Sequence, residues 1–109
     1  MKLAIIGSRD ASDIDISTYI PRGCTEIVSG GARGIDQCAK NTAEVLGLKL
    51  TEFIPDYKRY KKGTPLMRNK QIVEYSDEVL AFWNGVSVGT KYTIDYCEKT
   101  GKKCTVIYI

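Results

Sequence analysis

Short, mainly apolar runs alternate along the chain with segments in which the apolar residues recur at helical spacing. A short apolar run bounded by glycine, proline or polar residues is typical of a strand that is buried on both faces. Five runs predict such strands, at residues 2–6, 25–29, 48–54, 78–83 and 104–109.

The intervening segments predict helices. One helix is marked by a row of apolar and small residues on one face and ends at Gly47; the row is Ile35, Cys38, Ala39, Thr42 and Leu46. A short helix is expected over 16–20, before Pro21 breaks the pattern. Two more helices are expected, one with Pro65 in its first turn and one that ends at Gly101.

Strands that alternate with helices through short loops predict a parallel sheet covered on both faces. Right-handed crossovers then give an α/β, three-layer Rossmann-like sandwich with a parallel five-stranded sheet in the order 3-2-1-4-5. The 109 residues are 43% hydrophobic and 27% charged, an ordinary mixture for a globular protein. We therefore expect residues 1–109 to form a single domain.

Polar and glycine-rich segments follow three of the strands: Gly7-Ser8-Arg9, the segment 30–34 (Gly-Gly-Ala-Arg-Gly) and residues 84–90. In such a sheet the ligand site lies at the carboxyl ends of the strands, beside the switch in strand order. Segment 30–34 enters a helix, whose N-terminal N–H groups attract anions, and Arg33 can add a bidentate contact to phosphate. The glycines could instead only form a tight turn, but three such loops at one edge favour a phosphate-bearing ligand.

Several kinds of chemistry are excluded or disfavoured by residues that the sequence lacks. It has no histidine, which excludes Ser-His-Asp and Cys-His catalysis and every histidine-containing zinc site. The four cysteines include no C-x-x-C pair, so we expect free thiols and no metal site. Neither a Walker A loop nor a G-x-G-x-x-G motif after the first strand is present, so no nucleotide cofactor is expected.

The positive charge is concentrated in one segment. Residues 58–70 contain six basic residues and no acidic one, whereas the other 96 residues contain ten basic and thirteen acidic residues. A solvated loop is the ordinary interpretation, and single-stranded nucleic acid is the competing one because Tyr57 and Tyr60 adjoin the basic residues. Residues 56–64 follow the third strand, so we predict a flap at the ligand edge that contributes to binding mainly by charge.

The chain has no apolar run of the roughly 18 residues that a membrane span needs, and its apolar start is too short for a signal peptide. We therefore expect a soluble, cytoplasmic protein that does not associate with membranes.

Four motifs, in this order along the chain, resemble the SLOG superfamily, and most of all its small YspA/YpsA-related branch. They are Gly7-Ser8-Arg9, the eight residues 29–36, Arg68-Asn69 and Gly89-Thr90. The resemblance spans essentially the whole chain and implies a Rossmann-like domain that senses or processes nucleotides and their derivatives. Segment 29–36 is also similar to a loop of DNA-processing protein A, which binds single-stranded DNA. Relatives in the superfamily further imply a homo-oligomer, such as a dimer.

The motifs and the resemblance together define a candidate ligand-binding set at the carboxyl edge of the sheet. Its members are Gly7, Ser8, Arg9, Gly30, Gly31, Ala32, Arg33, Gly34, Asp36, Arg68, Asn69, Gly89 and Thr90.

Lonely Guy phosphoribohydrolases, another SLOG branch, cleave the base from a nucleoside monophosphate. Their pattern of a catalytic Arg-Lys, an Asp nine residues after the Arg, and Gly-Thr-x-x-Glu is matched here by Arg68, Asp77 and 89–90. Arg68 is thus the only catalytic candidate. Asn69 replaces the Lys and Thr93 replaces the Glu, which the cleavage needs as a carboxylate. Binding is therefore expected, and turnover stays open.

Three residues near these motifs have two interpretations each. Asp36 could contact a ribose hydroxyl or stabilise the dipole of the helix that it begins. Arg9 could contact phosphate or pair with a neighbouring aspartate. Trp83 is expected to belong to the core and to border the pocket only with its indole.

Overall fold

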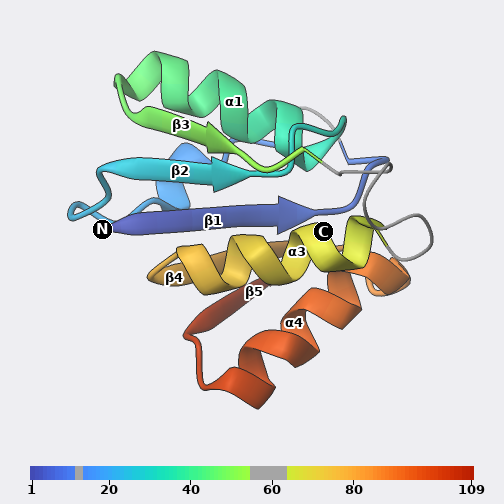
Figure 1. The fold of residues 1–109 in the computed structure, drawn as a ribbon. Coiled ribbons are helices and arrows are strands. Elements are labelled where there is room, and N and C mark those ends of the chain that lie inside the picture. Colours follow the sequence, from blue (N-terminus) through green and yellow to red (C-terminus); the bar gives the residue numbers. More distant parts are fainter. Residues whose placement is uncertain (12–13, 55–63) are drawn as a thin grey trace.

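The structure is a computed structural model that describes residues 1–11, 14–54 and 64–109. The described residues form one all-parallel, five-stranded sheet in the order β3-β2-β1-β4-β5 (Figure 1). The strands are β1 (Lys2–Gly7), β2 (Glu26–Ser29), β3 (Lys49–Glu52), β4 (Glu78–Trp83) and β5 (Cys104–Tyr108). The predicted fold class and strand order are confirmed.

Helices connect these strands and cover both faces of the sheet. They are the 3-10 helix η1 (Ser17–Tyr19) and the α-helices α1 (Ile35–Leu46), α3 (Thr64–Tyr75) and α4 (Val88–Thr100). Among the described residues, no helix combines the length and the apolar character that crossing a bilayer would require.

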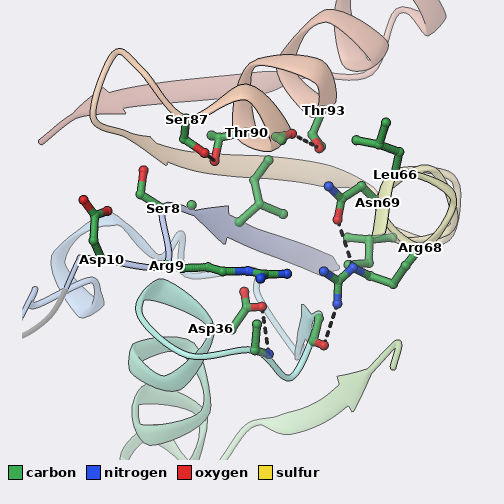
Figure 2. Close-up of a pocket in the computed structure, with 16 residues that line it drawn as sticks. Ser8, Arg9, Asp10, Asp36, Leu66, Arg68, Asn69, Ser87, Thr90 and Thr93 are labelled. Atoms are coloured by element: carbon green, nitrogen blue, oxygen red, sulfur yellow. Dashed lines mark hydrogen bonds between the residues drawn. The ribbon is translucent and has the colours of Figure 1, made fainter. Parts of the chain in front are cut away.

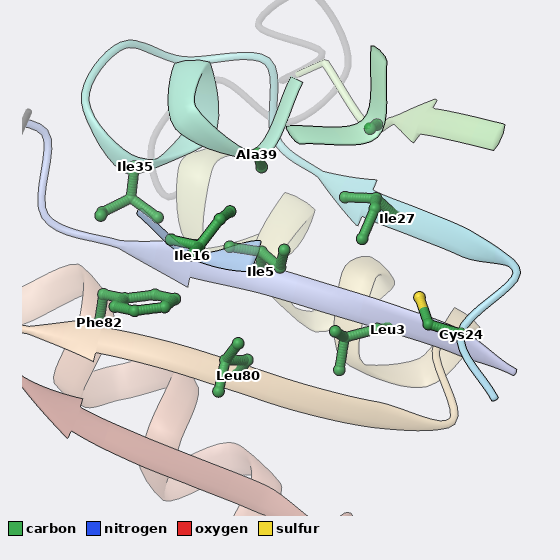
Figure 3. Close-up of a cluster of buried hydrophobic side chains, with 10 residues drawn as sticks. Leu3, Ile5, Ile16, Cys24, Ile27, Ile35, Ala39, Leu80 and Phe82 are labelled. Atoms are coloured by element: carbon green, nitrogen blue, oxygen red, sulfur yellow. The ribbon is translucent and has the colours of Figure 1, made fainter. Parts of the chain in front are cut away.

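One face of the sheet packs against α1. Leu3 and Ile5 of β1 alternate with residues that face the other way, and both join a buried cluster with Ile27, Ile35 and Phe82 (Figure 3). Ile16, which is fully buried just before η1, closes the same cluster. Because Ile35 is the first residue of α1 and is buried in this cluster, the packing holds the start of α1 against the sheet, directly after segment 30–34.

The opposite face packs against α3 and α4. Ala4 and Ile6, the alternate residues of β1, join a second cluster with Val28, Ile72 and Cys97. Because β1 is central and apolar on both sides, it holds the two helical layers together. The carboxyl end of β1 thus lies between α1 on one face and α3 and α4 on the other.

Two helix ends lie where the sequence predicts them. Gly47 follows α1 with a φ of +67°, and its N–H donates to the carbonyl oxygens of Ala43 and Glu44. Gly101 ends α4 in the same way, with a φ of +75°. Glycine is favoured at both positions because the left-handed conformation strains residues that have a Cβ.

The first, second and fifth strands differ from their predicted bounds by one residue, and three other elements differ in ways that bear on the fold. The helix expected over 16–20 is a single 3-10 turn, because Ile20 precedes Pro21 and is extended (φ −83°, ψ 121°). The third strand is confined to 49–52 instead of 48–54. Helix α4 begins at Val88, so Gly89 and Thr90 belong to its first turn and not to the loop over 84–89.

Candidate functional site

A cavity of about 340 Å³ lies at the carboxyl edge of the sheet (Figure 2), beside the paired strands β1 and β4, between which the strand order switches direction. This is the switch point in strand order, at which ligands bind in open α/β sheets. Its lining comes from β1 and the loop after it, segment 30–36, α3 and the start of α4. The lining residues are Ile6, Gly7, Ser8, Arg9, Asp10, Gly30, Ala32, Asp36, Leu66, Arg68, Asn69, Ile72, Ser87, Gly89, Thr90 and Thr93.

The structure brings most of the predicted set together around this cavity. Ten of the thirteen predicted residues line it: Gly7, Ser8, Arg9, Gly30, Ala32, Asp36, Arg68, Asn69, Gly89 and Thr90. Gly31 and Arg33 line an adjoining cavity of about 500 Å³ instead, together with Gln37 and Ile54. Gly34 lines neither cavity.

Gly34 lies outside both cavities and has a packing role beside them. Its φ is +75°, and a Cβ there would lie 2.5 Å from the carbonyl oxygen of Arg9. The glycine therefore lets the start of α1 pack directly on the backbone of the loop after β1. Gly34 thus positions the start of α1 relative to the loop after β1. Ala32 and Asp36, two residues to either side of it, line the first cavity.

Ser8 presents a buried hydroxyl to the cavity. Its backbone is fixed, because its N–H donates to the carbonyl of Phe82 (3.3 Å) and its own carbonyl accepts the N–H of Ile35 (3.4 Å). The residue is 1% exposed, yet its Oγ has no hydrogen-bond partner among the described residues. A buried polar atom without a partner costs free energy, and at a cavity wall a bound ligand or an ordered water supplies the missing hydrogen bond.

The N-terminus of α4 faces the cavity close to Ser8. The Asn84 side chain accepts the N–H groups of Val86 and Ser87 (both 2.9 Å), and the indole of Trp83 donates to the carbonyl of Ser87 (3.0 Å). The Ser87 side chain contacts Thr90 (3.1 Å) and does not cap the helix backbone. The partial positive charge of this helix end is thus directed at the cavity without a capping side chain.

Gly89 leaves the approach to this helix end open. Its backbone is helical, and a Cβ added there would contact nothing within 4 Å. Neither backbone conformation nor packing requires glycine at this position. Because Gly89 lines the cavity, the open space beside it gives a ligand access to the end of α4.

Arg68 of α3 is held by the protein. It is 6% exposed; its Nη1 donates to the carbonyls of Gly30 (2.7 Å) and Phe53 (3.3 Å), and its Nε donates to Asn69 (2.9 Å). A Cβ at residue 30 would lie only 2.6 Å from Cζ of the guanidinium. Glycine at position 30 therefore admits the arginine, which joins the ends of β2 and β3 to α3.

Arg9 and Asp36 line the side of the cavity that is next to the start of α1 (Figure 2). Figure 2 shows the Arg9 side chain extending from the loop after β1 across the cavity toward Arg68. Arg9 forms no ion pair with a carboxylate in the described part of the chain. Asp36 accepts the N–H of Ala32 (3.0 Å) and lies in the first turn of α1. Asp36 thus stabilises segment 30–34 and the helix end while it also faces the cavity.

Thr93, which the resemblance to the Gly-Thr-x-x-Glu motif predicts at the position of the Glu, lines the cavity. It is 1% exposed, and its hydroxyl donates to the carbonyl of Gly89 (3.0 Å). Asp95, two residues further on, pairs instead with Lys91 (2.6 Å) and does not line the cavity. The carboxylates at the cavity are Asp10 and Asp36.

Residues 55–63 are not described, so the flap predicted over 56–64 lies outside the described residues except for residue 64, as do four of the six basic residues of segment 58–70. The basic residues of segment 58–70 that the structure describes are Arg68 and Lys70. Arg68 is buried, and the Lys70 ammonium lies over the ring of Tyr96, 5.5 Å from its centroid. All four cysteines are free thiols. A hydrogen bond with Cys104 and burial raise the pKa of the Cys97 thiol, which disfavours its use as a nucleophile.

Sequence reasoning missed six lining residues: Ile6, Asp10, Leu66, Ile72, Ser87 and Thr93. For Asp10 and Ser87 a signal was available, because they adjoin the predicted motifs. Trp83 does not line the cavity, but its indole supports the loop that does. The apolar members belong to elements whose packing faces only the fold reveals.

No family model, curated protein or solved structure matches this chain.

Proposed function

We propose that the cavity binds a nucleotide-derived ligand through a phosphate group placed between Ser8 and the start of α4. The observation that carries the proposal is the unpartnered, buried Oγ of Ser8 in the cavity wall. A phosphate oxygen would accept its proton in a charge-assisted hydrogen bond. The uncapped end of α4 and the open space beside Gly89 provide the remaining anion-binding features.

Two further features support a nucleotide rather than an isolated anion. The cavity volume of about 340 Å³ falls within the range of small-molecule sites. Asp36 faces the cavity with a carboxylate, the group that contacts ribose hydroxyls in dinucleotide-binding folds. The resemblance of four motifs to the SLOG superfamily favours the same ligand class, and membership of that superfamily is part of the proposal.

The test compares two serines that share one feature. Ser8 and Ser29 both bury an unpartnered hydroxyl, but Ser29 lines neither cavity. We expect Ser8→Ala to weaken AMP binding at least tenfold, because a hydrogen bond to a charged group contributes about 1.5–3 kcal/mol. Calorimetric titration measures the affinity, and thermal unfolding should show neither variant to be less stable than the parent.

Ser29→Ala should leave AMP binding unchanged. Equal affinity in the parent and in Ser8→Ala would contradict the proposed phosphate position, and failure of the parent to bind AMP, ADP or a longer nucleotide derivative such as ADP-ribose would contradict the function itself.

Phosphoribohydrolase activity gains no support from the cavity, because Thr93 offers a hydroxyl donor to Gly89 and no carboxylate. Binding of single-stranded nucleic acid remains a prediction from the basic segment. Its affinity should fall steeply with salt if that segment carries it.

A further inference from the structure

The candidate site does not end at the first cavity. The adjoining cavity of about 500 Å³ shares four lining residues with it: Arg9, Gly30, Ala32 and Arg68. The two spaces therefore adjoin at Arg9, whose side chain extends across the first cavity from the loop after β1 (Figure 2). A ligand that reaches this junction from the first cavity has a second space directly ahead of it.

The two cavities differ in chemistry. The first has the Ser8 hydroxyl and the end of α4, which complement an anion. The second is lined by Arg33, Gln37 and Ile54, of which Ile54 is an aliphatic side chain that is 64% exposed. A cation, an amide and an exposed apolar surface together suit a polar organic group with a flat or apolar face, such as a sugar or a base.

Resting on the proposed function, we propose that the ligand carries an internal phosphate with an organic group on each side, so that it occupies both cavities. The phosphate linkage keeps its place between Ser8 and the start of α4, one organic group fills the rest of the first cavity, and the other extends past Arg9 and lies against Arg33, Gln37 and Ile54. A nucleoside monophosphate, whose phosphate is terminal, leaves the second cavity empty. Phosphodiester and diphosphate linkages both meet this requirement, because each joins an organic group on either side of the phosphate.

Three probes with one nucleoside in common test this inference by calorimetry. AMP has a terminal phosphate, the dinucleotide ApA has a phosphodiester between two nucleosides, and ADP-ribose has a diphosphate between two sugars. We expect ApA or ADP-ribose to bind at least tenfold more tightly than AMP, the effect of about one additional charge-assisted contact. Whichever probe binds more tightly identifies the linkage.

Variants at the second cavity supply the decisive comparison. Arg33 and Gln37 are exposed, line only the second cavity and hold no core contact, so Arg33→Ala/Gln37→Ala should fold normally. The double variant should weaken binding of the longer probe more than binding of AMP and so remove the advantage of the longer probe. Lys40 is exposed on α1, the helix that also carries Gln37, and lines neither cavity. Lys40→Ala should therefore leave the affinity for every probe unchanged and serves as the control for the lost positive charge.

Two outcomes overturn the inference while the proposed function stands. One is AMP binding as tightly as both longer probes, and the other is an equal loss for AMP and the longer probe in the double variant. Binding of none of the three probes overturns both.

Discussion

At the amino end of β2 the buried carboxylate of Glu26 has a full set of partners, whereas at the opposite edge of the sheet the buried hydroxyl of Ser8 has none. Glu26 is 7% exposed and accepts hydrogen bonds from Tyr75 (2.6 Å) and Thr51 (2.7 Å), with Lys49 at 3.7 Å. Both residues are buried, but only the one at the amino edge has hydrogen-bond partners within the protein. The carboxylate at the amino edge is satisfied internally, whereas the carboxyl edge has two unpartnered hydroxyls, Ser8 and Ser29, of which only Ser8 lines a cavity.

The difference separates stability from binding within one small sheet. Buried polar groups in native proteins are nearly always hydrogen-bonded, so a satisfied cluster is explained by folding alone. An unsatisfied group in a cavity lowers stability until something binds to it. Substitutions at the two edges should therefore act on different measurements.

The largest effect is expected for Glu26→Ala. The change leaves the hydroxyls of Tyr75 and Thr51 without their acceptor in a partly buried environment. We expect the free energy of unfolding to fall by about 3 kcal/mol, the scale for breaking a buried charged hydrogen-bond network. Denaturant titration measures the loss, and AMP affinity under folded conditions should stay the same. Glu52→Ala, on the exposed end of β3, is the control and should lose little.

The same carboxylate makes stability depend on pH. The hydrogen bond from Tyr75 holds the pKa of Glu26 below its ordinary value of 4.5. Its stabilisation is therefore complete above pH 4.5 and is lost as the pH falls through the lowered pKa of the folded state. Glu26→Gln, which does not titrate, should show a smaller decrease in stability from pH 6 to pH 3 than the parent. An identical decrease in both proteins would remove Glu26 from the acid sensitivity.

An intermediate effect is expected for Arg68→Lys, because Arg68 joins the stable framework to the binding edge. Lysine keeps the charge but cannot donate to Gly30, Phe53 and Asn69 in the fixed geometry of a guanidinium. We expect about 2 kcal/mol less stability and weaker AMP binding, since the end of β2 then loses its anchor.

The control for Arg68 is Gly30→Ala, whose methyl group would displace the same guanidinium. If Arg68 acts by positioning, combining the two substitutions should cost clearly less than the sum of the single losses. Full retention of AMP affinity in Arg68→Lys would instead assign the residue to a simple charge contact.

The sequence predicted those features that depend on neighbouring residues. The apolar runs located all five strands, and Gly47 and Gly101 marked the ends of two helices. Ser8 was predicted to belong to the site because it follows a strand, and Asp36 because it begins a helix. Gly89 and Thr90 were predicted there because they end the polar segment after the fourth strand and match a motif of the resembled family. Parallel strands bring such segments to one edge.

The features that sequence reasoning missed depend on residues far apart in the chain. Arg68 contacts Gly30 across 38 positions, so its burial against a carbonyl could not be read from the Arg-Asn motif. Gly34 belongs to a glycine-rich motif, yet its φ and the carbonyl of Arg9 explain it without a ligand. Thr93 and Ile72 face the cavity only because α3 and α4 pack side by side on the sheet.

The smallest effect is expected for Gly89→Ala, and it has opposite signs in stability and in binding. A methyl group at residue 89 meets nothing within 4 Å, and alanine favours the helix, so unfolding should cost about 0.5 kcal/mol more. The same methyl group occupies the approach to the end of α4, so AMP affinity should fall. Gly23→Ala is the matched control, because its Cβ also meets open space and it lies outside the cavity. A gain in stability at residue 89 without any loss of affinity would place the phosphate away from this helix end.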